Sequence, residues 1–175
     1  MKLEYGKIKG LDGLVFVLRD TNKIHAVYPF LCDKITKTFA TAYLKDKGVN
    51  ISPKKADLSW LGAFLKGDVG LKFELFDLGV TTDFRKKVYK KLFNTKSGAV
   101  MSYGELSPGG ARAVGSAMKN NPAPLLIPCH RVSSKSGKEL YTITCSCKKP
   151  STCNIKDTSV CSKRIKNMIR NYETV

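Results

Sequence analysis

A cysteine, a histidine and an arginine follow one another at residues 129–131, directly after the apolar run Leu125-Leu126-Ile127. A thiol attacks well only as its thiolate, so nucleophilic chemistry needs a neighbouring base or cation that favours the thiolate. Cys129 has such neighbours in His130 and Arg131. Buried cysteines are also common as packing residues, so these residues alone leave both interpretations open.

A short helix is predicted just before this cluster. Residues 107–122 begin with turn residues, end with Asn-Asn-Pro and enclose an Ala-rich helix of about three turns. Gly115 lies inside that helix, where glycine costs about 1 kcal/mol relative to alanine. Two explanations stay open for it: something approaches the helix closely from outside, or another helix packs tightly against it.

The first 78 residues contain alternating strand and helix signals. The runs 14–18 and 24–28 predict a β-hairpin, and a helix is predicted between Asp33 and Gly48. Leucines at 58, 61 and 65 predict a second helix that ends before Gly67. In residues 71–78, apolar residues at every second position predict a strand.

The chain is strongly basic, and the charge is uneven. It has 31 Lys or Arg and 14 Asp or Glu residues in 175, a net charge of +17, and residues 79–175 hold 18 basic and 5 acidic side chains. A boundary is predicted at Gly79, followed by a helix capped by Thr82 with one apolar and one basic face. The concentration of positive charge favours a polyanionic partner over a merely solvated lysine-rich surface.

The N-terminus and the cysteines bear on the compartment. The first ten residues carry charges through what would be the apolar part of a signal peptide, and no stretch approaches the roughly 18 apolar residues of a membrane span. Six unevenly spaced cysteines do not resemble the framework of a small secreted domain. These features predict a cytoplasmic protein, or a nuclear one if the source is eukaryotic.

Residues 101–132, MSYGELSPGGARAVGSAMKNNPAPLLIPCHRV, closely resemble the signature of the O6-alkylguanine-DNA alkyltransferases, also called methylated-DNA–protein-cysteine methyltransferases. The resemblance covers the C-terminal half well and the first 78 residues only in general layout. It implies an α+β fold: a small ribonuclease H-like sheet with helices over 1–78, and a helical domain with a winged helix-turn-helix over 79–175.

The resemblance also implies the chemistry. Cys129 matches the acceptor that displaces the alkyl group from O6 of guanine and is not regenerated. His130 matches the histidine that removes the thiol proton through a water, and Glu173 matches the carboxylate that orients this histidine. Asn121 matches the residue that fixes the active-site turn, and Tyr103 matches the tyrosine that donates a proton to the leaving guanine. No cofactor is implied.

DNA binding is implied in the same way. The target nucleotide must leave the duplex, and Arg112 matches the arginine that fills the gap from a helix in the minor groove. Small or polar residues of that helix would allow close approach, and Met118 and Val132 match parts of the guanine pocket. The predicted DNA-binding residues are Ala111, Arg112, Gly115, Ser116, Lys119 and Arg131, with phosphate contacts also from Lys87 and Lys135. A monomer is expected.

Two segments depart from the family pattern. The stretch between Tyr103 and Arg112 is shorter than in the family, so the first helix of the helix-turn-helix must be short or remodelled. The loop after the active site lacks the family's glycines: Tyr141 aligns with its tyrosine, and Thr142 with the residue whose N–H meets O6. Loss of these glycines should stiffen the loop and narrow the range of alkyl groups. Equal or faster reaction with O6-benzylguanine than with O6-methylguanine would contradict this.

A Cys-rich insertion is predicted at about residues 144–163. The spacing of its cysteines is not a standard zinc pattern, and reduced thiols, disulfides and a zinc site stay open. Zinc in the N-terminal half has only Cys32 and His25 as candidates, and both have adequate explanations as core residues. The cysteines of the insertion are Cys145, Cys147, Cys153 and Cys161.

The sequence therefore predicts a single-turnover DNA repair protein that transfers an alkyl group from O6 of guanine to its own Cys129. Two other classes remain as alternatives. One is an alkyltransferase-like protein that binds damaged guanine without repairing it; such relatives replace the acceptor cysteine, which is present here. The other is a Cys-His thiol hydrolase, which would explain neither the basic C-terminal half nor Arg112.

Overall fold

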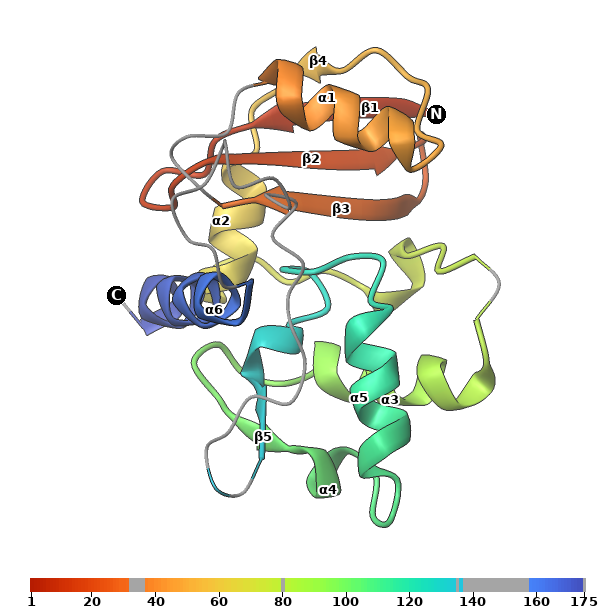
Figure 1. Cartoon of the computed structure of the whole chain (residues 1–175), viewed down its shortest axis with the longest axis vertical. Coiled ribbons are helices and arrows are strands. Elements are labelled where there is room, and N and C mark those ends of the chain that lie inside the picture. The colour runs from red at the N-terminus through yellow and green to blue at the C-terminus, as the bar shows by residue number, and fades with distance from the viewer. Residues whose placement is uncertain (32–36, 80, 135, 137–157, 175) are drawn as a thin grey trace.

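A four-stranded sheet forms one end of the molecule (Figure 1). The computed structural model describes residues 1–31, 37–79, 81–134, 136 and 158–174. The strands pair in the order β3-β2-β1-β4, antiparallel except for the parallel pair β1 and β4. They are β1 (Lys2–Gly6), β2 (Leu14–Arg19), β3 (Ile24–Phe30) and β4 (Lys54–Lys55).

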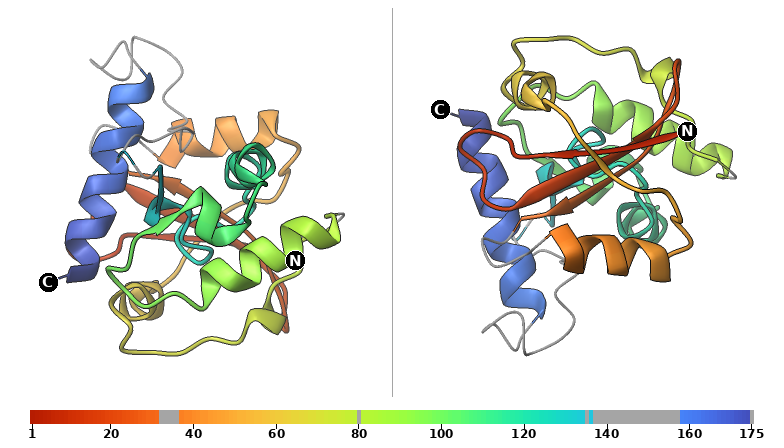
Figure 2. Two further views of the ribbon diagram at one scale, coloured as in Figure 1. Left: turned by 90° about the horizontal axis from the view of Figure 1, so that it is seen from below. Right: turned by 90° about the horizontal axis from the view of Figure 1, so that it is seen from above.

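Two helices flank this sheet. α1 (Lys37–Asp46) covers one face, and α2 (Ser59–Lys66) lies on the opposite side (Figure 2). α2 ends as predicted at Gly67, which adopts a left-handed conformation with φ of 85°. A left-handed residue after the last turn is a common helix end, and glycine adopts it without strain.

The predicted hairpin is confirmed as β2 and β3. Its turn is held by the Asp20 carboxylate, which accepts hydrogen bonds of 2.8 Å from the backbone N–H groups of both Asn22 and Lys23. Strand β1 was not predicted, because its five residues are too short and too charged to show a clear pattern. Its place beside β2 is reinforced by a two-pronged ion pair between Glu4 and Arg19, with distances of 2.7 and 2.9 Å.

The strand predicted over residues 71–78 is wrong. Phe73–Leu75 form a single 3-10 turn, η1, and the segment makes only one isolated bridge, between Phe76 and Ile24. The reason lies in the aromatic packing. The ring centroids of Phe73 and Phe76 lie 5.6 and 5.4 Å from that of Phe93, so the residues that pack together are three apart, the spacing of a 3-10 helix, and not two apart.

The other end of the molecule is mainly helical (Figure 1). Thr82 caps α3 as predicted, since its hydroxyl accepts from the N–H of Arg85 at 3.3 Å. A one-turn helix follows a short strand, and a four-residue turn connects it to α5, so the expected short first helix is confirmed. The elements are α3 (Asp83–Phe93), β5 (Met101–Ser102), α4 (Tyr103–Leu106), α5 (Ala111–Lys119), the 3-10 turn η2 (Cys129–Arg131) and β6 (Val132–Ser133).

The last helix, α6 (Thr158–Thr174), packs against both α2 and η2. Residues 158–163, the last part of the predicted Cys-rich insertion, are therefore helical. The other cysteines of that insertion, Cys145, Cys147 and Cys153, lie outside the described residues, as do Cys32, Lys135, Tyr141 and Thr142.

One hydrophobic core joins the two ends. The cluster of buried residues runs from Leu3 and Phe16 in the sheet through Leu61 in α2 to Leu92 in α3 and Ile127 before η2. The backbone links them as well, since the N–H of Val27 in β3 donates to the carbonyl of Pro122 at 2.9 Å. Within the described ranges, no helix is long and apolar enough to cross a membrane.

Candidate active site

The segment that leads into η2 is held by its own backbone and by Asn121. The amide of Asn121 donates to the carbonyl of Ile127 at 2.7 Å, and its carbonyl accepts from the N–H of Ala123 at 3.0 Å. Leu125 within this turn has φ of 81° and is the one non-glycine residue with positive φ in the described part of the chain. Such a conformation costs about 1–3 kcal/mol and persists only where its surroundings enforce it.

η2 presents Cys129 and His130 in a buried position. Cys129 is 2% exposed and His130 is fully buried. The His130 imidazole has its Nε2 at 2.7 Å from Oε1 of Glu173, which comes from the end of α6. The other ring nitrogen, Nδ1, is buried and meets no hydrogen-bond partner among the described residues. A carboxylate that accepts from Nε2–H leaves Nδ1 as an acceptor, which is the arrangement of a general base.

Glu173 is the centre of a larger buried network. Its Oε1 accepts from Nη2 of Arg131 at 2.8 Å, and its Oε2 accepts from the backbone N–H of Gly98 at 3.2 Å. Arg131 also donates from Nη1 to the carbonyl of Thr95 at 2.7 Å. The carboxylate and the arginine therefore balance each other's charge inside the protein, which a buried ion pair requires.

The surroundings shift both titratable groups. Burial lowers the pKa of His130 from its ordinary 6.5, and this effect outweighs the hydrogen bond that His130 donates to Glu173, which would raise the pKa. Burial would raise the pKa of Glu173, but the hydrogen bonds and charges of His130 and Arg131 hold this pKa below 4.5. At neutral pH the pair is thus a neutral imidazole and a carboxylate.

Arg131 corrects one prediction. It was expected to contact DNA phosphate, but it is only 4% exposed and bonded to Glu173 and Thr95. Its function in this structure is to neutralise the buried carboxylate. The two other predicted phosphate contacts that the structure describes, Lys87 and Lys119, are exposed.

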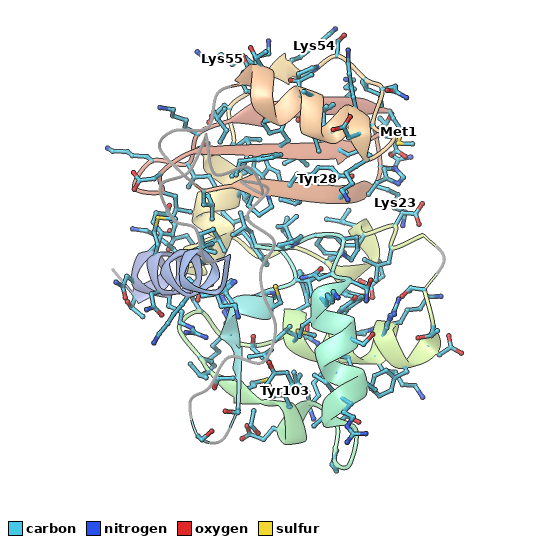
Figure 3. The ribbon with its side chains drawn as sticks, viewed as in Figure 1. Met1, Lys23, Tyr28, Lys54, Lys55 and Tyr103 are labelled. Atoms are coloured by element: carbon cyan, nitrogen blue, oxygen red, sulfur yellow. The ribbon has the colours of Figure 1, made fainter. Side chains whose placement is uncertain are left out.

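Three of the residues predicted for the site, Tyr103, Met118 and Val132, lie in the described part of the chain. β5 and β6 pair in parallel with Met101 opposite Val132, so Tyr103, the first residue of α4, follows a strand that lies beside the end of η2. Figure 3 shows Tyr103 among α4, β5 and α5. Tyr103, Met118 and Val132 are all buried.

Tyr89 was not singled out from the sequence. Its hydroxyl donates to the carbonyl of Ala117 in α5 at 2.7 Å. Burial raises the pKa of Tyr89 to about 12, although the positive charge of Arg85 acts in the opposite direction. The available signal was its place between Val88 and Leu92, which predicts a buried helix face but not a polar contact.

α5 has one buried and one exposed face. Val114, Ala117 and Met118 pack inward, whereas the predicted DNA-contacting residues Ala111, Arg112, Ser116 and Lys119 are exposed. A methyl group added at Gly115 would meet no atom within 4 Å. Packing against another helix therefore does not explain this glycine among the described residues.

No metal site is found in the described part of the chain, where no group of three or more His, Cys, Asp or Glu side chains could hold an ion. His25 lies 2.7 Å from Asp20 and 3.4 Å from Asp77. The His25 imidazole therefore has two carboxylate neighbours.

Comparison with known proteins shows which family the chain resembles. Residues 83–149 match the family model described as the DNA binding domain of 6-O-methylguanine DNA methyltransferase. A methylated-DNA–protein-cysteine methyltransferase of Thermococcus barophilus is 38% identical over 141 residues, 75% of each chain. One from Pyrococcus horikoshii is 38% identical over 129 residues, which cover 69% of this chain and 74% of that protein.

Solved structures share the fold. The O6-methylguanine-DNA methyltransferase of Pyrococcus kodakaraensis superimposes with a TM-score of 0.63 at 24% identity and covers 99% of both chains. The Mycobacterium tuberculosis protein OGT in complex with DNA gives a TM-score of 0.60 at 22% identity, over 98% of this chain and 93% of that one.

Proposed function

Because this chain belongs to the methylated-DNA–protein-cysteine methyltransferases, which repair DNA by direct reversal, we propose that Cys129 is its alkyl acceptor. One observation carries the assignment. The residue that follows Cys129 is a fully buried histidine whose Nε2 is held by Glu173 at 2.7 Å and whose Nδ1 has no hydrogen-bond partner in the described structure. This geometry leaves Nδ1 to accept the thiol proton.

The proposed reaction is a single displacement that moves the alkyl group from O6 of guanine to the sulfur of Cys129. His130 takes the proton of the Cys129 thiol, directly or through one water, and the resulting thiolate attacks the alkyl carbon on O6 of guanine. A C–S bond forms as the C–O bond breaks, and the electron pair of the broken bond stays with guanine. Tyr103 donates a proton to the leaving guanine. The thioether is stable, so each molecule reacts once.

We expect this reaction to tolerate mild acid. Only the neutral imidazole accepts a proton, and burial holds the pKa of His130 below 6.5. The single-turnover rate constant should therefore stay constant as the pH falls to about 6.5 and decline only below that value. Rapid-quench measurements across the pH range test this, and a decline that begins above pH 6.5 would contradict it.

The DNA-binding mode is also a proposal. α4 and α5, joined by residues 107–110, would form a helix-turn-helix with β5 and β6 as a small wing, and the exposed face of α5 would enter the minor groove. Residues 79–175 would then form the DNA-binding and acceptor domain, and residues 1–78 a ribonuclease H-like domain. Arg112 would fill the gap left by the flipped nucleotide. The monomeric state stays a prediction.

Gly115→Ala is expected to move stability and DNA affinity in opposite directions. The added methyl group meets open space, so helix propensity should raise the free energy of unfolding by about 0.5–1 kcal/mol. If DNA lies close to this backbone, the same methyl group should weaken duplex binding about tenfold, or about 1.4 kcal/mol. Thermal unfolding and binding titrations measure both quantities.

Gly70→Ala is the matched control, because a methyl group there also meets nothing within 4 Å and the residue lies far from α5 in the sequence. It should leave duplex affinity unchanged. A G115A variant that binds the duplex as tightly as wild type would contradict the close approach of DNA to α5.

Intact mass and peptide mapping test the proposed acceptor. After incubation with a duplex that contains O6-methylguanine, one methyl group should appear in the peptide with Cys129, stop at one equivalent and be absent from Cys129→Ser. No gain with a retained preference for the damaged duplex would identify a binder that does not repair. Continued turnover would identify a hydrolase.

A further inference from the structure

One face of α6 supports the active-site turn. Lys166, Arg170 and Glu173 are spaced by four and three residues, which brings them to the same side of a helix. α6 packs against η2, and Lys166 and Glu173 are both buried. Glu173 accepts a hydrogen bond from the His130 side chain, so this face of α6 supplies a polar group to η2.

Arg170 binds the backbone of the catalytic turn. Its Nε donates to the main-chain carbonyl of His130 at 2.8 Å. Its Nη1 lies 3.4 Å from Oδ1 of Asn167, one helical turn earlier. A charged donor makes a stronger hydrogen bond to a carbonyl than a neutral one. The contact therefore fixes the peptide plane that follows His130, in a turn of only three residues.

The guanidinium also acts on the imidazole electrostatically. The charged groups around His130 are Glu173 and Arg170 from α6 and Arg131 from η2, with the buried Lys166 on the same face of α6. Among the described residues, the other titratable groups of the candidate site are Cys129 of η2, Tyr89 of α3 and Tyr103 of α4. β5 and β6 contribute none. The positive charge of Arg170 lowers the pKa of His130, in the same direction as its burial.

We propose that Arg170 is a positioning residue for alkyl transfer: it clamps the main chain of His130 from α6, while Glu173 clamps its side chain. The two contacts come from one helix and hold the imidazole at its backbone and at Nε2. Nδ1, the ring nitrogen that Glu173 does not bind, is thereby kept in a fixed direction. This inference rests on the proposed roles of Cys129 and His130.

The guanidinium of arginine holds this carbonyl in a more fixed geometry than the ammonium of lysine would. Its Nε–H points at the carbonyl while its Nη atoms point elsewhere, so the fork is oriented by more than one contact. Lysine could keep the positive charge near His130 but not this fixed geometry. Substitutions with lysine and methionine therefore separate the effect of charge from that of position.

The test compares R170M, R170K and wild type by single-turnover methyl transfer across a pH series. R170M removes both contact and charge, so we expect a rate constant about tenfold lower at neutral pH and a decline that begins at higher pH. R170K keeps the charge, so its rate constant should also fall while its decline begins at the same pH as in wild type. Thermal unfolding is measured for each variant.

Lys163→Met is the control, because it removes an exposed cation from the same helix and should change neither the rate constant nor the pH of the decline. An R170M variant with the rate constant and pH profile of wild type would overturn the proposal. So would losses of rate that follow only the loss of stability in both variants, with no shift in the pH profile. Failure of wild type to methylate Cys129 would instead overturn the proposed function.

Discussion

Glu173→Ala is expected to lower the free energy of unfolding by about 3–5 kcal/mol and to abolish methyl transfer. The carboxylate accepts hydrogen bonds from His130 and Arg131, and its side chain is fully buried. Its removal leaves the guanidinium of Arg131, which is 4% exposed, as a buried charge without its counter-ion. It also releases the imidazole from its fixed orientation. Chemical denaturation and single-turnover methylation measure the two losses.

Adding Arg131→Met separates the loss of stability from the loss of methyl transfer. In the double variant E173A/R131M neither charge is buried, so much of the lost stability should return, since a buried ion pair can often be replaced by apolar side chains without loss. Methyl transfer should stay absent, because His130 still has no carboxylate to orient it. A double variant that regains both stability and transfer would show that Glu173 serves the fold alone.

The candidate site residues were named from the resemblance to the family, and three of them lie close together in the sequence. Cys129 and His130 are adjacent, and Asn121 precedes them within a single turn that its own amide closes onto Ile127. Helix ends were equally local: the hydroxyl of Thr82 bonds a backbone group three residues away. For this helix cap, whose physical cause acts within a few residues, the pattern of residue types was sufficient.

The predictions failed where contacts with segments distant in the sequence determine the structure. Residues 71–78 alternate as a strand does, but the rings of Phe73 and Phe76 pack on Phe93, which is about twenty positions away. Arg131 follows the catalytic pair in a basic segment, and only the fold shows that Glu173 removes it from the surface. Arg170 had no signal at all, because its partner is a backbone carbonyl forty residues earlier.

Arg112→Ala is expected to slow methyl transfer from duplex DNA by about 10- to 100-fold and to leave transfer from a single strand nearly unchanged. Extrusion of a nucleotide from a duplex costs a few kcal/mol, and each 1.4 kcal/mol corresponds to a factor of ten. Arg112 is exposed on α5 and makes no hydrogen bond or ion pair with the residues that the structure describes. Its removal should therefore change the free energy of unfolding by no more than about 0.5 kcal/mol.

Lys119→Ala is the comparison that tests whether Arg112 fills the gap in the duplex or only contributes a positive charge. Lys119 is exposed near the end of the same helix, and a phosphate contact there should weaken binding whether the DNA is single- or double-stranded, with a salt slope smaller by about one. A single strand has no gap to fill, so only a side chain that replaces the flipped base should matter more for the duplex. If R112A slows transfer equally from both substrates, Arg112 is a second phosphate contact, and the vacated position in the stack must be filled by another residue of α5.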